Sequence, residues 1–141
     1  MAVDERYINN YFQLTLDRYY EKSDYTLILK VCTSFVPNLS AERSSKAMIE
    51  VNFPNGFAAN KTSLLNLSDA NPITNYELQY NRTTLLVYYA SIGTEWTCFN
   101  MTANRLLKVA PQRKAYVLVH DILKPEYRAI VQYGVPPEAM N

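Results

Sequence analysis

The sequence predicts an all-β protein, with the architecture of an antiparallel two-sheet β-sandwich of about seven to nine strands. Apolar and polar residues alternate along most of the 141 residues, which is the period of half-buried strands. Proline, asparagine or glycine interrupts these runs at 37–38, 54–56, 71–72, 92–93, 110–111 and 124–125, a spacing typical of antiparallel sheets. Twelve tyrosines and an apolar fraction of 48% supply side chains for a core between the sheets.

Seven strands, or slightly more, follow from this pattern. In chain order they are expected at 12–18, 25–35, 47–53, 83–89, 96–101, 115–121 and 127–133. The alternation is clean in four of them; in 25–35, for example, Leu27, Leu29 and Val31 fall on one face and Lys30 and Cys32 on the other. In 12–18, 83–89 and 115–121 the residues are β-branched or aromatic, but the alternation is blurred.

One short helix is expected near 60–68, where NKTSLLNLS places leucines at helical spacing and Asn60 can cap the first turn. No linker or repeat divides the chain, so 1–141 is interpreted as a single domain, with a flexible tail at 134–141 that carries Pro136 and Pro137.

Charge and composition argue against several functions. With 14 Lys and Arg against 13 Asp and Glu, the net charge of +1 gives no field that would attract nucleic acid or an anionic membrane. The chain has three glycines, whereas phosphate-binding loops are rich in glycine. No apolar run is long enough to insert into a membrane. The single histidine, His120, stands beside Asp121, but neighbours on a strand point to opposite faces. We therefore expect no enzyme, no metal site and no cofactor.

Five Asn-x-Ser/Thr sequons begin at Asn38, Asn60, Asn66, Asn81 and Asn100. Composition alone would give roughly two, so the excess predicts N-glycosylation at these five positions. The start of the chain, MAVDERYINN, lacks the apolar core of a secretory signal. The sequence is therefore interpreted as a fragment of a larger secreted, extracellular protein behind an added Met1; the alternative is that an Asn-rich β protein contains unused sequons.

The two cysteines, Cys32 and Cys98, both fall on the polar faces of their strands. Free cysteine normally packs as a small hydrophobe, and exposed thiols rarely stay unpaired in an oxidising compartment. A Cys32–Cys98 disulfide is expected, against the alternative of two unrelated free cysteines. The pairs Tyr19-Tyr20 and Tyr88-Tyr89 each place one ring on each strand face, so one ring of each pair should be exposed or covered by another domain.

The order of segments resembles the C-terminal receptor-binding domain of the α2-macroglobulin, complement and insect thioester-containing protein family. The resemblance rests on VCTSFVPN (31–38), SSKAMIEVNFPNGF (44–57), the helical segment at 60–68, LLVYYASI (85–92), TCFNMTANRLLKVAPQRKAYVLVHDIL (97–123) and YRAIVQYGVP (127–136). It covers nearly the whole chain, and VCTSF and TCFNMTANR are similar to the arthropod branch.

This resemblance implies a non-catalytic interaction domain of a secreted innate-immunity protein, placed last in the chain, after a thioester domain. Its partners would be the thioester domain and neighbouring domains of the parent chain, and a lipoprotein-receptor-like or other cell-surface receptor. Family members bind such receptors through two lysines one helical turn apart; Lys61 occupies the first position, and Leu65 stands at the second. The pattern therefore favours packing against the thioester domain. A free-standing immunoglobulin-like adhesion or ligand-binding module of the cell surface is the alternative, because the strand pattern also permits it.

Overall fold

The computed structural model describes residues 2–8, 11–21, 25–38, 41–64, 73–106 and 114–134. These residues form ten strands and one short 3₁₀ helix, η2. In chain order they are β1 (Ala2–Ile8), β2 (Phe12–Glu21), β3 (Thr26–Phe35), β4 (Ala47–Asn52), β5 (Phe57–Ala59), η2 (Lys61–Leu64), β6 (Ile73–Gln79), β7 (Thr84–Tyr89), β8 (Thr97–Arg105), β9 (Ala115–Asp121) and β10 (Arg128–Tyr133). The all-β prediction is confirmed; the seven expected strands are present, and three more bring the number above seven to nine.

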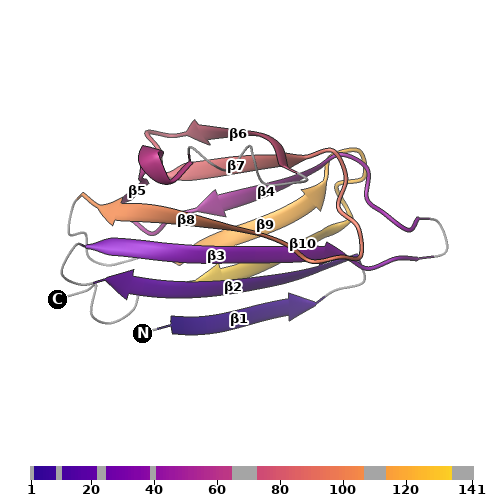
Figure 1. Ribbon diagram of the computed structural model, residues 1–141, viewed down its shortest axis with the longest axis horizontal. Coiled ribbons are helices and arrows are strands. Elements are labelled where there is room, and N and C mark those ends of the chain that lie inside the picture. Colours follow the sequence, from indigo (N-terminus) through magenta and orange to yellow (C-terminus); the bar gives the residue numbers. More distant parts are fainter. Residues whose placement is uncertain are drawn as a thin grey trace.

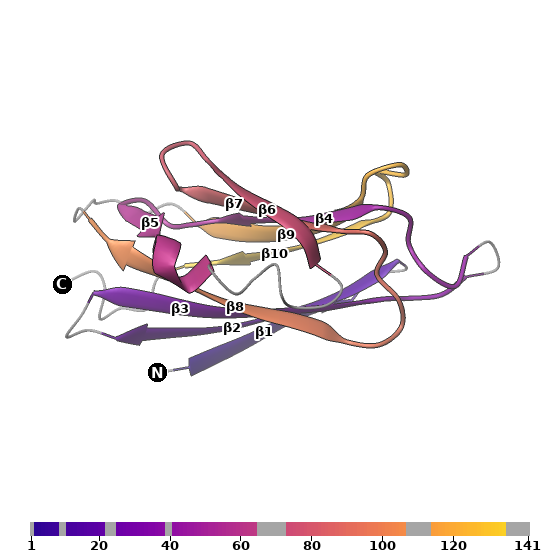
Figure 2. The ribbon, with the colours of Figure 1, turned by 45° about the horizontal axis from the view of Figure 1, so that its top comes forward.

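The strands form two antiparallel sheets of five strands each, in the orders β1-β2-β3-β8-β5 and β10-β9-β4-β7-β6. We call these the first and the second sheet. Figure 2 shows them as two layers, with β2, β3 and β8 in one and β4, β7 and β9 in the other. The chain crosses between the layers several times, for example from β3 to β4 and from β7 to β8, so neighbouring strands often come from distant parts of the sequence (Figure 1).

Alternating side chains of both sheets fill the space between the layers. On the first sheet they include Phe12, Leu14, Leu29, Val31, Phe99 and Met101, and on the second Ile49, Val51, Leu85, Val87, Val117 and Val119, all of them buried. Each such side chain stabilises the fold by about 1.5–3 kcal/mol relative to the exposed state. At one end of the sandwich the rings of Tyr11 and Tyr127 stack with centroids 4.0 Å apart and tie the two sheets together.

Three strands, β5, β6 and β1, were not predicted, each for a different physical reason. The short strand β5 has three residues, which is too few to show a period. In β6 the pairing with β7 shifts register between Ile73 and Asn75. Because of this bulge, the residues that pack against the core are Ile73, Tyr76 and Leu78. Ile73 and Tyr76 are three residues apart, so the strict two-residue alternation is lost. The third, β1, contains three charged residues, which hide its pairing with β2.

The expected helix is a single 3₁₀ turn within the described residues. Asn60 caps it as predicted, because its Oδ1 accepts a hydrogen bond of 2.9 Å from the Thr62 amide. Leu64 faces the core and is 2% exposed. Residues 65–68 of the predicted helix and 135–141 of the predicted tail lie outside the described residues.

Candidate interaction surface

The outer face of the second sheet carries a cluster of apolar and aromatic side chains, although this face is turned away from the core and also carries polar residues such as Glu50, His120 and Arg128. Strand register places these outward side chains in adjacent rows: Leu118 pairs with Ile130 on one side, and Met48 pairs with Tyr88 on the other. Ile130 is 42% exposed, whereas Leu86 is only 7% exposed because its neighbours cover it. We call this surface the apolar face; its residues are Met48, Leu86, Tyr88, Tyr116, Leu118 and Ile130.

On the outer face of the first sheet polar side chains predominate, although Ile28 and Trp96 are exposed there. Its strands β2, β3 and β8 turn mainly polar side chains outward, including Gln13, Thr15, Asp17, Lys30, Asn100, Thr102 and Asn104. Soluble proteins rarely expose a contiguous apolar patch unless it contacts a partner. The cluster of apolar side chains on the second sheet is therefore the candidate docking surface.

Two tyrosine rings of the apolar face are held in place by carboxylates within it. The Tyr88 hydroxyl donates a 2.7 Å hydrogen bond to Glu77, and the Tyr116 hydroxyl donates to Glu50. The hydrogen bond to Glu77, together with burial, raises the pKa of Tyr88 to about 12. Because both hydroxyls are engaged, the rings lie ordered before any partner arrives, which reduces the entropic cost of binding. As expected for adjacent tyrosines, Tyr89 points into the core and is 2% exposed.

His120 borders the apolar face. It pairs across the strands with Met48 and Arg128, while Asp121 points to the inner side and is 1% exposed. Burial lowers the pKa of His120, and Arg128 lowers it further, against the opposing charges of Glu50 and Asp121. Among the described residues no three His, Cys, Asp or Glu side chains gather in a way that could hold a metal ion.

Asp121 fixes the loop between β9 and β10. Its carboxylate accepts hydrogen bonds from the amides of Ser45 (2.9 Å), Leu123 (2.9 Å) and Lys124 (3.0 Å), and from the Ser45 hydroxyl. Burial by itself would raise the pKa of Asp121, but these hydrogen bonds outweigh it and lower the pKa. In this loop Leu123 is 70% exposed.

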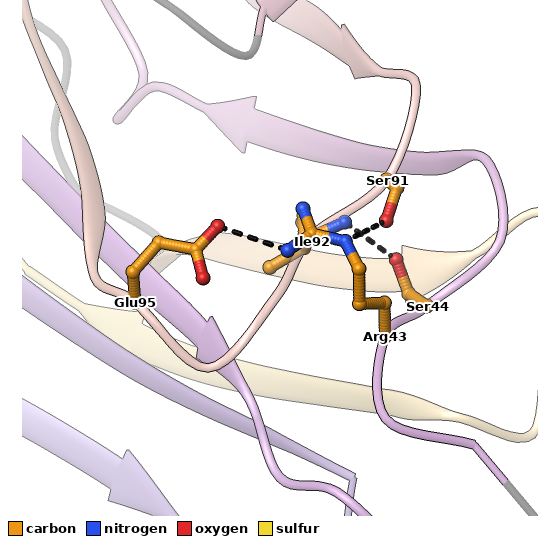
Figure 3. Close-up of polar contacts among 5 residues, drawn as sticks. All are labelled: Arg43, Ser44, Ser91, Ile92 and Glu95. Atoms are coloured by element: carbon orange, nitrogen blue, oxygen red, sulfur yellow. Dashed lines mark hydrogen bonds and ion pairs between the residues drawn. The ribbon is translucent and has the colours of Figure 1, made fainter.

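A second polar cluster orders the crossover from β7 to β8, as Figure 3 shows. Arg43 donates from Nε to the Ser91 hydroxyl (2.9 Å) and from Nη1 to Glu95 (3.1 Å). The buried Ser44 pairs with Ile92, donating from its amide to the Ile92 carbonyl and accepting the Ile92 amide at its hydroxyl. A Cβ atom at Gly93 would collide with the Arg43 guanidinium, so a larger residue there would require this flexible side chain to move.

Cys32 and Cys98 form a disulfide, as predicted. They lie directly opposite one another on β3 and β8, and both side chains point outward from the first sheet.

The other predicted site residues are dispersed. Lys61 is exposed on η2, and its expected partner position Leu65 lies outside the described residues. Asn81 and Asn100 are exposed, Asn60 is half-buried, and Asn66 lies outside the described residues. The Nδ2 atom of Asn38 is buried, and its Oδ1 accepts the Ala41 amide at 3.0 Å.

The apolar face was not predicted from the sequence, but a signal for it existed. TLLVYY in β7 and AYVLVHD in β9 are nearly continuous apolar runs, which is why their alternation looked blurred. Such runs are typical of strands that are covered on both faces. One side of each run packs in the core, and the other forms the apolar face.

The chain is thus an all-β sandwich in which outward apolar side chains gather on the second sheet. Comparison with known proteins gives the family: the A-macroglobulin receptor binding domain matches residues 42–134. The chain is also similar to two alleles of thioester-containing protein 1 of Anopheles gambiae. It is 41% identical to allele R1 over 126 residues and 40% identical to allele S3 over 124 residues, which are 89% and 88% of this chain. The chain belongs to the A-macroglobulin receptor-binding domain family. It spans 9% of the length of these relatives.

Proposed function

We propose that this chain is the non-catalytic C-terminal interaction domain of a secreted, complement-like thioester-containing protein of innate immunity. In this proposal, residues 1–141 form one domain of a longer polypeptide, and the apolar face packs against the thioester domain of the same chain. A receptor on a cell surface would be a second partner, for which Lys61 on η2 is the candidate contact.

The observation that carries the proposal is the apolar face. This face is suited to contact with a partner, because hydrogen bonds to Glu77 and Glu50 fix the rings of Tyr88 and Tyr116. Aliphatic side chains surround these two rings. Aromatic and aliphatic groups that are held rigid in this way usually provide most of the binding energy of an interface. Relatives about ten times longer than this chain offer further domains that could cover it.

The positions of the sequons also support the apolar face as the docking surface. None of the five begins within β4, β6, β7, β9 or β10, whereas Asn100 lies on the outer side of β8. A glycan is bulky and hydrated, so a docking surface must be free of one. Among the described residues, no helix is long and apolar enough to span a membrane.

The test compares two isoleucines with similar exposure on opposite faces. Ile130 on the apolar face is 42% exposed, and Ile28 on the first sheet is 38% exposed, so replacing either with glutamate should leave the core intact. Binding of each variant to the separately produced thioester domain of the parent polypeptide would be measured by calorimetry and sedimentation. We expect Ile130→Glu to weaken binding by about tenfold or more, because it places a charge in an apolar contact. Ile28→Glu should bind as the unchanged chain does.

Equal affinities of the two variants would overturn the assignment of the face. No association of the unchanged chain at high micromolar concentration would overturn packing against the thioester domain. It would favour the immunoglobulin-like adhesion module, for which a cell-surface ligand would then be sought.

A further inference from the structure

One aromatic side chain stands out on the polar face of the first sheet. Trp96, the single tryptophan of the chain, is 47% exposed just before β8. Together with Thr15, Cys32 and Cys98 it lines a shallow hollow of about 160 Å³. The indole ring and the disulfide therefore form a small apolar site among polar neighbours. An exposed tryptophan in such surroundings indicates a ligand with both apolar and polar surfaces.

A sequon shares the outward row of β8 with this site. Cys98 and Asn100 both point outward and are exposed, while Phe99 between them is buried in the core. Two residues along a strand span about 7 Å, so Asn100 stands within the reach of one or two sugar units of the disulfide. Lys30 lies opposite Asn100 on β3 and keeps the surroundings polar.

We infer that an N-linked glycan on Asn100 lies back along β8 and covers Trp96 and the Cys32–Cys98 disulfide. This inference rests on the proposed secretion of the protein, because attachment requires the secretory pathway. Attachment joins Asn100 Nδ2 to the anomeric carbon of an oligosaccharide carried on a lipid diphosphate; the lipid diphosphate leaves, and Nδ2 loses one proton.

The chemistry of a sugar ring fits the hollow. A pyranose ring presents C–H groups on one side, which pack against an indole, while its hydroxyl groups stay in water or bond to polar neighbours such as Thr15. The covalent link supplies a high effective concentration, so a weak contact is sufficient to hold the glycan in place. A second copy of the chain would lack this advantage and would have to dock on a largely polar face.

The experiment uses the 141-residue chain secreted from insect cells. Two variants, Asn100→Gln and Thr102→Ala, remove the sequon without changing the hollow, and Thr102→Ser alters the same position but preserves the sequon. Asn81→Gln removes a sequon at the distant β6–β7 turn and serves as the matched control. Acrylamide quenching of tryptophan fluorescence reports on Trp96 alone, and the rate of reduction by dithiothreitol reports on the disulfide.

We expect the quenching constant to rise roughly two-fold in Asn100→Gln and Thr102→Ala, because the exposed half of the ring loses its cover. Reduction of the disulfide should accelerate in the same two variants, and Thr102→Ser and Asn81→Gln should match the unchanged chain. Equal quenching in all forms would overturn the inference, as would quenching in Thr102→Ala that decreases with protein concentration, which would identify a second copy as the cover.

Glycan mapping separates this inference from the proposed function. A chain glycosylated at Asn81 but not at Asn100 would overturn the glycan cover and leave the apolar face unaffected. A chain secreted with no glycan at any sequon would overturn the glycan cover and remove the sequon argument for a secreted parent, whereas binding to the thioester domain would still be decided by Ile130→Glu.

Discussion

The protonation state of the Asp121 carboxylate should affect the order of the loop between β9 and β10, because the ionised form accepts the hydrogen bonds of this loop. In the folded chain the pKa of Asp121 lies below the value of an unfolded aspartate, about 3.9, because Ser45, Leu123 and Lys124 donate hydrogen bonds to the ionised form. The carboxylate therefore contributes stability that is fully present above the unfolded pKa. This contribution is lost as the pH falls through the folded pKa.

The prediction at this scale concerns Asp121→Asn. The variant should lose about 2 kcal/mol of unfolding free energy at pH 7, because hydrogen bonds to a charged acceptor become bonds to a neutral amide. It should also show a weaker fall in stability below about pH 4 than the unchanged chain. Urea unfolding followed by circular dichroism at several pH values measures both effects. The same pH slope in both proteins would contradict this role for Asp121.

Strands β3 and β8 of the first sheet are joined both by backbone pairing and by a disulfide. Eight residue pairs join the two strands, and Cys32–Cys98 is one of them. The residue pairs on both sides of the disulfide are in register, so we expect the backbone pairing to persist without the bond. The bond instead restricts the unfolded chain, because it closes a loop with a sequence separation of 66 residues.

Replacing both cysteines with alanine should therefore give a folded sandwich of lower stability. We expect a loss of about 2–4 kcal/mol, with the circular dichroism spectrum unchanged. Unfolding of the unchanged chain with and without dithiothreitol provides the control, because reduction should produce a similar loss. A variant that does not fold would show that the disulfide is required for the pairing of β3 with β8.

The sequons differ at the scale of the whole molecule, because the sandwich buries some acceptor atoms and exposes others. Asn81 lies at the tip of the β6–β7 turn, where Tyr80, Asn81 and Arg82 all have positive φ, and Asn100 lies on the outer side of β8; both are exposed. The Nδ2 atom of Asn38, to which a glycan would be joined, is buried. A glycan at this atom is incompatible with the folded loop.

Secreted, folded chains should therefore carry glycans at Asn81 and Asn100 and none at Asn38. Mass spectrometry of glycopeptides after enzymatic release in heavy-oxygen water measures the occupancy of each site. The five sequons look equivalent in the sequence, so this difference is a prediction of the fold alone. A high occupancy at Asn38 would mean that the loop after β3 has another conformation in the secreted protein.

The amino-acid pattern by itself determined the layered antiparallel architecture, the position of seven strands and the pairing of Cys32 with Cys98. Alternation of side chains is a local property of a strand, so it can be recognised without knowing the neighbours. Local reasoning failed at β6, where a bulge shifts the phase, and at β5, which is too short to show a period.

Only the tertiary structure decided which strands share a sheet and which outer face is apolar. Met48, Tyr88, Leu118 and Ile130 come from four strands, of which only β9 and β10 are consecutive in the chain, and they become one surface because β10, β9, β4 and β7 lie side by side. The burial of Asn38 Nδ2 and the hollow beside Trp96 arise in the same way. Strand order depends on long-range pairing between residues, and no local period in the chain encodes it.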